Sequence, residues 1–285
     1  MTTVADLAEL VRAPAALSVP GDVVAGATAA RALGPRTAAL AGASVLLYWA
    51  GMAANDWADR RLDAVERPER PIPSGRVAPA TAVGLAAGLT AAGLGLAAAA
   101  GGRRATAVAL PLAAAIWGYD LTAKNTAAGP AVMAACRGLD VLLGATGGRV
   151  ARAVPAALTV AAHTWTVTAL SRREVTGADA ALPLRTLAGT VLVAVAATAS
   201  RQRDVTAALP VALAGWYVAR YGGAQARVVA EPTAGRVRAA VGAGITGLPA
   251  LQGALTARAG AGLLGLAVAA AAPLGRRLAR KVSPT

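Results

Sequence analysis

Long apolar segments separated by short polar connectors constrain the fold of this chain more than any other feature. A helix that crosses a bilayer needs about 20 mostly apolar residues. Several segments of roughly this length and character follow one another along the chain. They lie at residues 15–33, 37–55, 79–99, 105–121, 128–147, 153–170, 182–199, 205–221, 234–252 and 257–275. The pattern predicts an all-α polytopic membrane bundle of nine or ten transmembrane helices, with residues 1–285 as a single domain.

The composition supports this class and excludes others. Apolar residues make up 56% of the chain and charged residues 15%, whereas a soluble domain carries about 25% charged residues. An intrinsically disordered chain is poor in apolar residues, and the single Cys136 cannot form an intrachain disulfide bond. The net charge of +14 would point to nucleic acid in a soluble protein. Here the basic residues lie mainly in short connectors, where they set topology and meet lipid headgroups, so we expect membrane lipids and no nucleic acid as partners.

Three connectors differ from the others in their polar content. Residues 55–78, 119–127 and 171–181 each follow an even-numbered span, which places all three on one membrane face. Their basic residues are Arg60, Arg61, Arg67, Arg70, Arg76, Lys124, Arg172 and Arg173. By the positive-inside rule this face is cytoplasmic, although six arginines in the opposite connectors weaken the assignment. We expect a multi-pass protein of the plasma membrane, with the C-terminal basic residues 276–281 inside if there are ten spans and outside if there are nine.

The first of these connectors begins with a ladder of oxygen-bearing side chains. Asn55, Asp59 and Asp63 are spaced four apart, and Asp56 is adjacent. Residues four apart lie on nearly the same face of a helix, so their oxygens would form a column. Oxygen ligands with open positions suit Mg²⁺, which takes its remaining ligands from water and substrate phosphates. The alternative is a solvated acidic helix end neutralised by neighbouring arginines.

A proline-rich segment follows the ladder. Residues 67–76 read RPERPIPSGR, and proline fixes φ and lacks an N–H, so the segment is expected to form a stiff loop. Arg70 and Arg76 on such a loop would hold phosphate oxygens in a fixed geometry. Their alternative role is to signal topology at the start of a span.

These two motifs together resemble the UbiA-type intramembrane prenyltransferase superfamily. NDWADRRLD is similar to the first family motif, N-x-x-x-D-x-x-x-D, and RPIPSGR is similar to the turn that follows it. The resemblance covers the first two-thirds of the chain well and the last third only by hydropathy. It implies a helical bundle with a lateral opening to lipid, in which two Asp-rich sites bind the diphosphate of a polyprenyl donor through Mg²⁺.

The resemblance also implies roles for particular residues. Tyr119 and Lys124 fall where the family often has a Tyr and a Lys near the donor phosphates, with one residue more than the usual Y-x-x-x-K spacing. The implied catalytic residues are Asp59, Asp63, Lys124 and Glu174. The implied diphosphate contacts are Asn55, Arg60, Arg70, Arg76, Tyr119, Lys124 and Arg172. The implied metal ligands are Asn55, Asp56, Asp59, Asp63, Glu174 and Asp179.

The second family motif, D-x-x-x-D, is absent from its expected place after the sixth span. Residues 171–179 read SRREVTGAD, which resembles a divergent branch of the superfamily with an S-R-x-E signature. Glu174 and Asp179 are five apart and do not share a helix face, so a loop at Gly177 would have to bring them together to bind a second metal. Alternatively, Arg172 or Arg173 replaces the charge of one metal and contacts phosphate directly.

Polar residues inside the spans are further candidates. Arg137 and Asp140 lie three apart in the fifth span. An ionisable pair inside a membrane span is by default a candidate functional site. The alternative is that the two opposite charges only neutralise each other. Asp22 in the first span is a candidate cavity residue. His163 in the sixth span is expected to be a hydrogen-bonded packing residue.

These observations predict Mg²⁺-dependent transfer of a prenyl group from a polyprenyl diphosphate to a lipophilic or aromatic acceptor of unknown identity. Mg²⁺ and basic side chains would neutralise the leaving diphosphate, and a dry apolar cavity would protect the allylic carbocation. The alternatives are transfer of a phosphorylated sugar to a polyprenyl phosphate, cyclisation of the diphosphate, a non-catalytic membrane scaffold, and a transporter.

Overall fold

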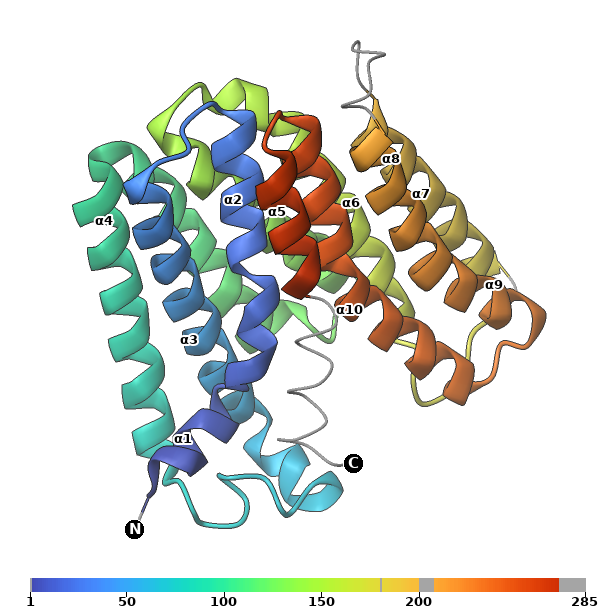
Figure 1. Ribbon diagram of the computed structural model, residues 1–285. Coiled ribbons are helices and arrows are strands. Elements are labelled where there is room, and N and C mark those ends of the chain that lie inside the picture. Colours follow the sequence, from blue (N-terminus) through green and yellow to red (C-terminus); the bar gives the residue numbers. More distant parts are fainter. Residues whose placement is uncertain (1, 180, 200–207, 272–285) are drawn as a thin grey trace.

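The computed structural model describes residues 2–179, 181–199 and 208–271, and within these ranges the chain is helical throughout its regular structure (Figure 1). The helices are α1 (Val4–Leu10), α2 (Pro20–Ala29), α3 (Pro35–Glu66), α4 (Pro79–Gly118), α5 (Gly129–Gly144), α6 (Val150–Ser171), α7 (Ala181–Thr198), α8 (Ala208–Tyr217), α9 (Gly223–Ala230) and α10 (Ala234–Arg258). A 3₁₀ segment, Ala13–Ser18, precedes α2, and a last apolar helix spans Gly262–Ala271. The predicted all-α bundle is confirmed.

The predicted spans coincide with these helices. Four helical segments are long and apolar enough to cross a membrane by length and composition: Pro35–Glu66, Pro79–Ala123, Val150–Ser171 and Ala181–Thr198. Helix α2 has only 10 residues and reaches about 15 Å, half of a bilayer core, so the first predicted span is shorter than expected. The C-terminal basic residues 276–281 lie outside the described residues, and the choice between nine and ten spans stays a prediction.

Helix α4 is a hairpin of two antiparallel arms. Gly102 interrupts its helical geometry with φ 59° and ψ −150°. Trp117 Nε1 donates a hydrogen bond of 3.0 Å to Thr90 Oγ1, although 27 residues of straight helix would separate the two by about 40 Å. The left-handed φ at Gly102 is therefore the point at which the chain reverses, and the arms correspond to the predicted spans 79–99 and 105–121.

Glycine allows α2 and α5 to pack with their backbones in contact. A Cβ atom on Gly26 would lie 1.7 Å from the carbonyl oxygen of Val141, and one on Gly144 would lie 2.0 Å from that of Val23. Without a strong hydrophobic drive between helices in lipid, close backbone approach through small residues is a main source of packing energy. This contact fixes α5, which carries Arg137 and Asp140, against α2, which carries Asp22.

The C-terminal half is held by a buried hydrogen-bonded cluster. His163 Nδ1 lies 2.8 Å from Tyr217 Oη, and Thr166 Oγ1 lies 3.1 Å from Tyr221 Oη. All four side chains are buried, and the rings of His163 and the two tyrosines meet edge to face at 5.4 Å. The arrangement is that expected for a packing histidine.

Candidate active site

The three polar connectors meet at one end of the bundle. Lys124, after the second arm of α4, forms an ion pair of 2.6 Å with Asp59 near the C-terminal end of α3. Arg172, after α6, donates a hydrogen bond to the carbonyl oxygen of Thr126. The parity of the predicted spans placed the three connectors on one membrane face, and these contacts join them into one polar end of the molecule.

Asn55 and Asp59 share one cation. Lys124 Nζ lies 2.6 Å from Asp59 Oδ1 and 3.2 Å from Asn55 Oδ1. The two residues are four apart on α3, so their side chains project from the same face. Their oxygens therefore converge on a single position that already holds a positive charge.

Asp56 and Asp63 form a separate pair on the same helix. Arg70 Nη1 lies 2.7 Å from Asp63 Oδ2 and 3.4 Å from Asp56 Oδ1, and Arg12 Nη2 lies 2.8 Å from Asp56 Oδ1. Both carboxylates are buried. The three residues of the predicted column therefore have different cationic partners. Asn55 and Asp59 contact Lys124, whereas Asp63 pairs with Arg70, which lies on the proline-rich loop.

This division bears on the predicted metal ligands. Within the described ranges, no group of three or more His, Cys, Asp or Glu side chains is arranged to hold a metal ion. The predicted six-residue ligand set is therefore not assembled. The Asn55–Asp59 pair does fit Mg²⁺, because two hard oxygen donors already converge on one cation position and Mg²⁺ draws its other ligands from water and phosphate.

Two of the predicted diphosphate contacts have other partners. The Arg60 guanidinium lies over the ring of Trp57, 4.7 Å from its centroid, and donates to the Trp57 carbonyl oxygen at 2.8 Å. Arg76 pairs with Glu9 at 2.7 and 3.0 Å and with Asp6 at 2.7 Å. Arg76 thus ties the proline-rich loop to α1, away from the α3 acids.

Asp6 in turn is held by Thr3. Hydrogen bonds from the Thr3 side chain and backbone, and then from Arg76, lower the pKa of Asp6 to about 2. The same contact raises the pKa of Arg76 through its hydrogen bonds to Glu9 and Asp6. The loop and α1 are therefore joined by groups that are charged near neutral pH.

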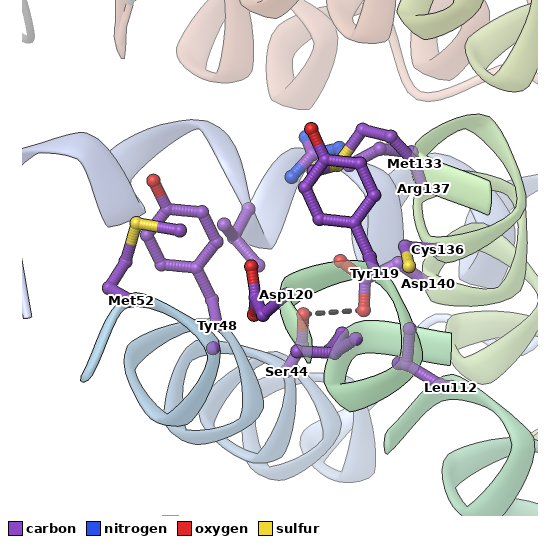
Figure 2. A pocket seen from close by; sticks show the side chains of 13 residues that line it. Ser44, Tyr48, Met52, Leu112, Tyr119, Asp120, Met133, Cys136, Arg137 and Asp140 are labelled. Carbon is purple, nitrogen blue, oxygen red and sulfur yellow. Dashed lines mark hydrogen bonds between the residues drawn. The ribbon is translucent and has the colours of Figure 1, made fainter. Parts of the chain in front are cut away.

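A cavity with about 520 Å³ of empty space, open solvent included, lies next to the Lys124 pair (Figure 2). Its lining comes from α3, the second arm of α4, the turn after α4, α5 and Val19. The lining residues are Val19, Ser44, Tyr48, Gly51, Met52, Leu112, Ile116, Tyr119, Asp120, Met133, Cys136, Arg137 and Asp140. Met52 precedes Asn55 by about one helical turn, so one end of the cavity is close to the paired oxygens, and the lining extends along α3 to Ser44.

A π-helical turn, Tyr119–Ala123, positions Tyr119 and Lys124. The Lys124 N–H donates to the Tyr119 carbonyl oxygen five residues earlier, at 3.0 Å. A π turn accommodates one more residue than an α turn. The extra residue between this Tyr and Lys, relative to Y-x-x-x-K, is thereby absorbed.

Asp120 is a candidate residue that the sequence analysis missed. Its side chain lines the cavity, is 3% exposed, and makes no hydrogen bond or close ion pair in the described part of the chain. Figure 2 shows its carboxylate between Tyr48 and Ser44. The sequence signal that could have identified Asp120 is its position directly after Tyr119, the tyrosine of the Tyr–Lys motif.

The deeper polar residues pair differently from the prediction. Arg137 pairs with Asp22 at 2.8 Å, and Asp140 accepts a hydrogen bond of 2.6 Å from Ser44 (Figure 2). Asp22 also accepts from Gln252 Nε2 at 2.6 Å and is fully buried. Asp22 is therefore not a lining residue but the anchor of Arg137. Arg137 and Asp140, each held by another helix, both face the cavity.

The connector after α6 uses its acids differently. Asp179 Oδ1 accepts from the N–H groups of Ala181 and Leu182 at 3.1 and 2.9 Å, which caps α7. Glu174 is half-buried; desolvation raises its pKa, while Arg238 and Arg67 oppose the shift. Gly177 has φ 77° in this connector, and Asp179 Oδ1 is engaged by the α7 cap rather than paired with Glu174.

Comparisons with known proteins agree with this arrangement. The profile of the UbiA prenyltransferase family matches residues 18–274. The digeranylgeranylglyceryl phosphate synthase of Methanopyrus kandleri is 44% identical over 81 residues, 28% of this chain and 28% of that protein. The protein of the same name from Methanothrix thermoacetophila is 54% identical over 41 residues, 14% of this chain and 15% of that protein. The matched stretch thus spans under a third of either relative.

Solved structures share the fold over nearly the whole chain. One, from work on digeranylgeranylglyceryl phosphate synthase in membranes, has a TM-score of 0.66 at 17% identity and covers 89% of this chain and 97% of its own. The apo structure of a UbiA homolog from Aeropyrum pernix has a TM-score of 0.62 at 21% identity and covers 88% and 96%. The apolar helices, the fold and the family match make this a multi-pass integral membrane protein. The chain belongs to the UbiA prenyltransferase family.

Proposed function

We propose that the chain, acting as one domain, transfers a prenyl group from a polyprenyl diphosphate to an acceptor inside the membrane. The observation that carries the proposal is the cation position shared by Asn55 and Asp59, next to the Met52 end of a mainly apolar cavity. Family membership supports the same activity, as do the names of the partial relatives.

The polar end is assigned to the donor diphosphate. Asn55 and Asp59 would hold Mg²⁺, which when bound offsets the negative charge of the leaving diphosphate. Lys124 then shifts from the carboxylate to a phosphate oxygen. Arg172, which already donates to Thr126 two residues beyond Lys124, supplies a second positive charge where the family motif would supply acids for a metal. Of the two alternatives for the second motif, this arrangement favours direct contact between arginine and phosphate.

The cavity is assigned to the prenyl chain and the acceptor. The bond between C1 of the allylic group and the diphosphate oxygen breaks, and its electron pair leaves with the diphosphate. The rings of Tyr48 and Tyr119 in the cavity lining stabilise the cation that remains. An electron pair of the acceptor then forms the new bond to C1.

Asp120 is assigned to the acceptor. It is the cavity carboxylate without a close partner in the described residues, so it is free to accept a hydrogen bond and then the proton of the acceptor nucleophile. Arg137 and the Ser44–Asp140 pair lie farther along α3 and α5 and would recognise a polar group of the acceptor. The expected acceptor is thus a lipophilic molecule with a hydroxyl group or an electron-rich ring.

The test is donor turnover by purified protein in detergent. Geranyl, farnesyl and geranylgeranyl diphosphates are each supplied with and without Mg²⁺, and diphosphate release is measured. Geranylgeranylglyceryl phosphate and an extract of membrane lipids serve as acceptor probes, with mass spectrometry of the products. Mg²⁺-dependent release with a prenylated product is expected. No release from any donor would contradict the proposal and favour a scaffold, and a cyclised product without acceptor would identify a cyclase.

A further inference from the structure

A second charged hollow lies at the other end of the bundle and plays no part in the proposed reaction. It is a shallow hollow with about 550 Å³ of empty space, open solvent included, and its lining is Ala30, Gly148 and the exposed Arg31, Arg149 and Arg152. It joins the chain after α2 to the start of α6, segments that are more than a hundred residues apart in the sequence. In the sequence, these arginines counted only against the predicted orientation of the chain in the membrane.

The length of α6 places this hollow at the opposite membrane boundary. The helix has 22 residues and spans about 33 Å, close to the thickness of a bilayer core. Arg172, just beyond its C-terminal end, lies at the polar end with Thr126, and Arg149 and Arg152 lie at its N-terminal end. The hollow therefore faces the headgroup region of the leaflet opposite the candidate active site.

The hollow is fixed by backbone contacts. The Arg149 N–H donates to the Ala30 carbonyl oxygen at 3.2 Å, and a Cβ on Gly148 would lie only 2.3 Å from that oxygen. Arg31 has φ 56° because it is the left-handed residue that ends α2: its N–H donates to the Thr28 carbonyl oxygen at 3.1 Å, and the next N–H, of Ala32, donates to that of Ala27 at 2.8 Å. Three arginines from two segments are thus presented around one hollow by a rigid connection.

The charges of the three arginines are unbalanced. Their guanidinium groups make no hydrogen bond or ion pair with the residues that the structure describes, and no acid lines the hollow. At the polar end, by contrast, Arg12 and Arg70 pair with aspartates. Three converging positive charges repel one another unless an anion lies among them, and the forked guanidinium group matches the oxygens of a phosphate. Basic pockets of this kind at membrane surfaces bind lipid headgroups.

We propose that Arg31, Arg149 and Arg152 bind the phosphate group of an anionic phospholipid in the leaflet opposite the active site. Free phosphate has the same oxygen chemistry, and the experiment separates the two sources. The inference does not depend on prenyl transfer.

The experiment uses native mass spectrometry of the full chain in detergent with equal phosphatidylglycerol and phosphatidylcholine. The triple variant R31Q/R149Q/R152Q is compared with R36Q/R103Q/R104Q, which removes the same charge from exposed arginines outside the hollow. The wild type and the control variant are expected to retain phosphatidylglycerol about tenfold more than phosphatidylcholine. The hollow variant is expected to lose this preference, because three phosphate contacts are removed.

Two further arms make the result decisive. Size-exclusion elution checks that each variant is folded, and R31K/R149K/R152K, which keeps the charge, is expected to retain part of the preference. Equal lipid retention by the hollow and control variants would overturn the proposal. Displacement of phosphatidylglycerol by millimolar inorganic phosphate would also overturn it, because the site would then be selective for the free ion.

Discussion

The connectors after α3 and after α6 stand at equivalent places in the family pattern, yet they use their acids in different ways. After α3, four oxygen-bearing side chains lie at the polar end of the bundle, each contacted by a cationic side chain from another segment. After α6, Asp179 is committed to the N-terminus of α7, and Glu174 is half-buried beside arginines. The acid that the motif comparison requires is present in the second connector but performs a structural task.

The difference teaches that the charge at a diphosphate site can be supplied in two ways. In the proposed reaction, the first connector would supply oxygens for a metal, and the second would supply Arg172, which donates to Thr126 in the Lys124 connector. Arginine keeps its charge and presents several donors, so it replaces the electrostatic part of a metal site without assembling ligands.

The largest effect is expected from Asp59→Asn. The substitution replaces the carboxylate by a neutral amide, which removes the negative charge that would hold Mg²⁺ beside Asn55, and should lower kcat/KM for Mg²⁺-dependent diphosphate release by about 100-fold or more. The matched control is Asp179→Asn in the second connector, which should keep activity within about twofold because Asn caps a helix as well as Asp. Equal losses in both variants would remove the distinction between the connectors.

Lys124→Gln is expected to have the next largest effect. The substitution removes the charge that faces the diphosphate and leaves Asp59 without its ion-pair partner. We expect kcat/KM to fall about 10- to 100-fold, with the same Mg²⁺ requirement. A variant with full activity would show that Lys124 only neutralises Asp59.

Arg172→Gln tests the second connector directly. If Arg172 contacts phosphate, the KM for the donor should rise about tenfold, the size of one charge-assisted hydrogen bond. The control is Arg173→Gln, an exposed neighbour that should change KM by less than twofold. A larger effect at Arg173 would reverse the assignment.

Asp179→Ala should separate stability from activity. The variant loses the cap of α7 and should unfold with a free energy lower by about 1 kcal/mol, while donor turnover stays near that of the wild type. Thermal unfolding in detergent and diphosphate release are measured on the same preparations. Loss of turnover with unchanged stability would restore Asp179 as a functional ligand.

The smallest effect concerns pH. The folded-state pKa of Asp6, about 2, lies below its usual value of 3.8, so its contribution to stability is present above about pH 4 and is lost as the pH falls toward 2. Amide protection of α1, corrected for the intrinsic exchange rate, should therefore decrease between pH 5 and pH 3. In Arg76→Gln this decrease should be smaller, because the variant lacks the Arg76 hydrogen bond that helps to lower the pKa of Asp6.

Local spacing in the sequence predicted the helices, the meeting of the connectors and the shared face of Asn55 and Asp59. These features depend on residues close together in the chain. The ion pairs do not: Arg12 reaches Asp56 across 44 residues, and Arg137 reaches Asp22 across more than a hundred. Periodicity cannot choose between such partners, so it separated neither Asp63 from Asn55 and Asp59 nor Asp22 from the cavity lining.

Asp120 and Asp179 also show that the sequence alone does not reveal which acidic side chains have partners in the fold. Asp120 became a candidate only when folding placed its carboxylate in the cavity without a close partner among the described residues. Asp179 lies ahead of an apolar helix, and a cap two residues before Ala181 was a local feature that the motif comparison obscured. The family pattern indicated where the site is, and the contacts indicate which side chains remain free to act.

The most direct test is to count the divalent cations bound at the polar end. Electron paramagnetic resonance with Mn²⁺ in place of Mg²⁺ is measured on purified protein, with and without geranylgeranyl thiolodiphosphate, a donor whose bond to sulfur resists cleavage. We expect one bound Mn²⁺ per chain when the analogue is present, its loss in Asp59→Asn and its retention in Asp179→Asn. Mn²⁺ binding that survives Asp59→Asn, or that disappears in Asp179→Asn, would contradict the assignment of the metal to the connector after α3.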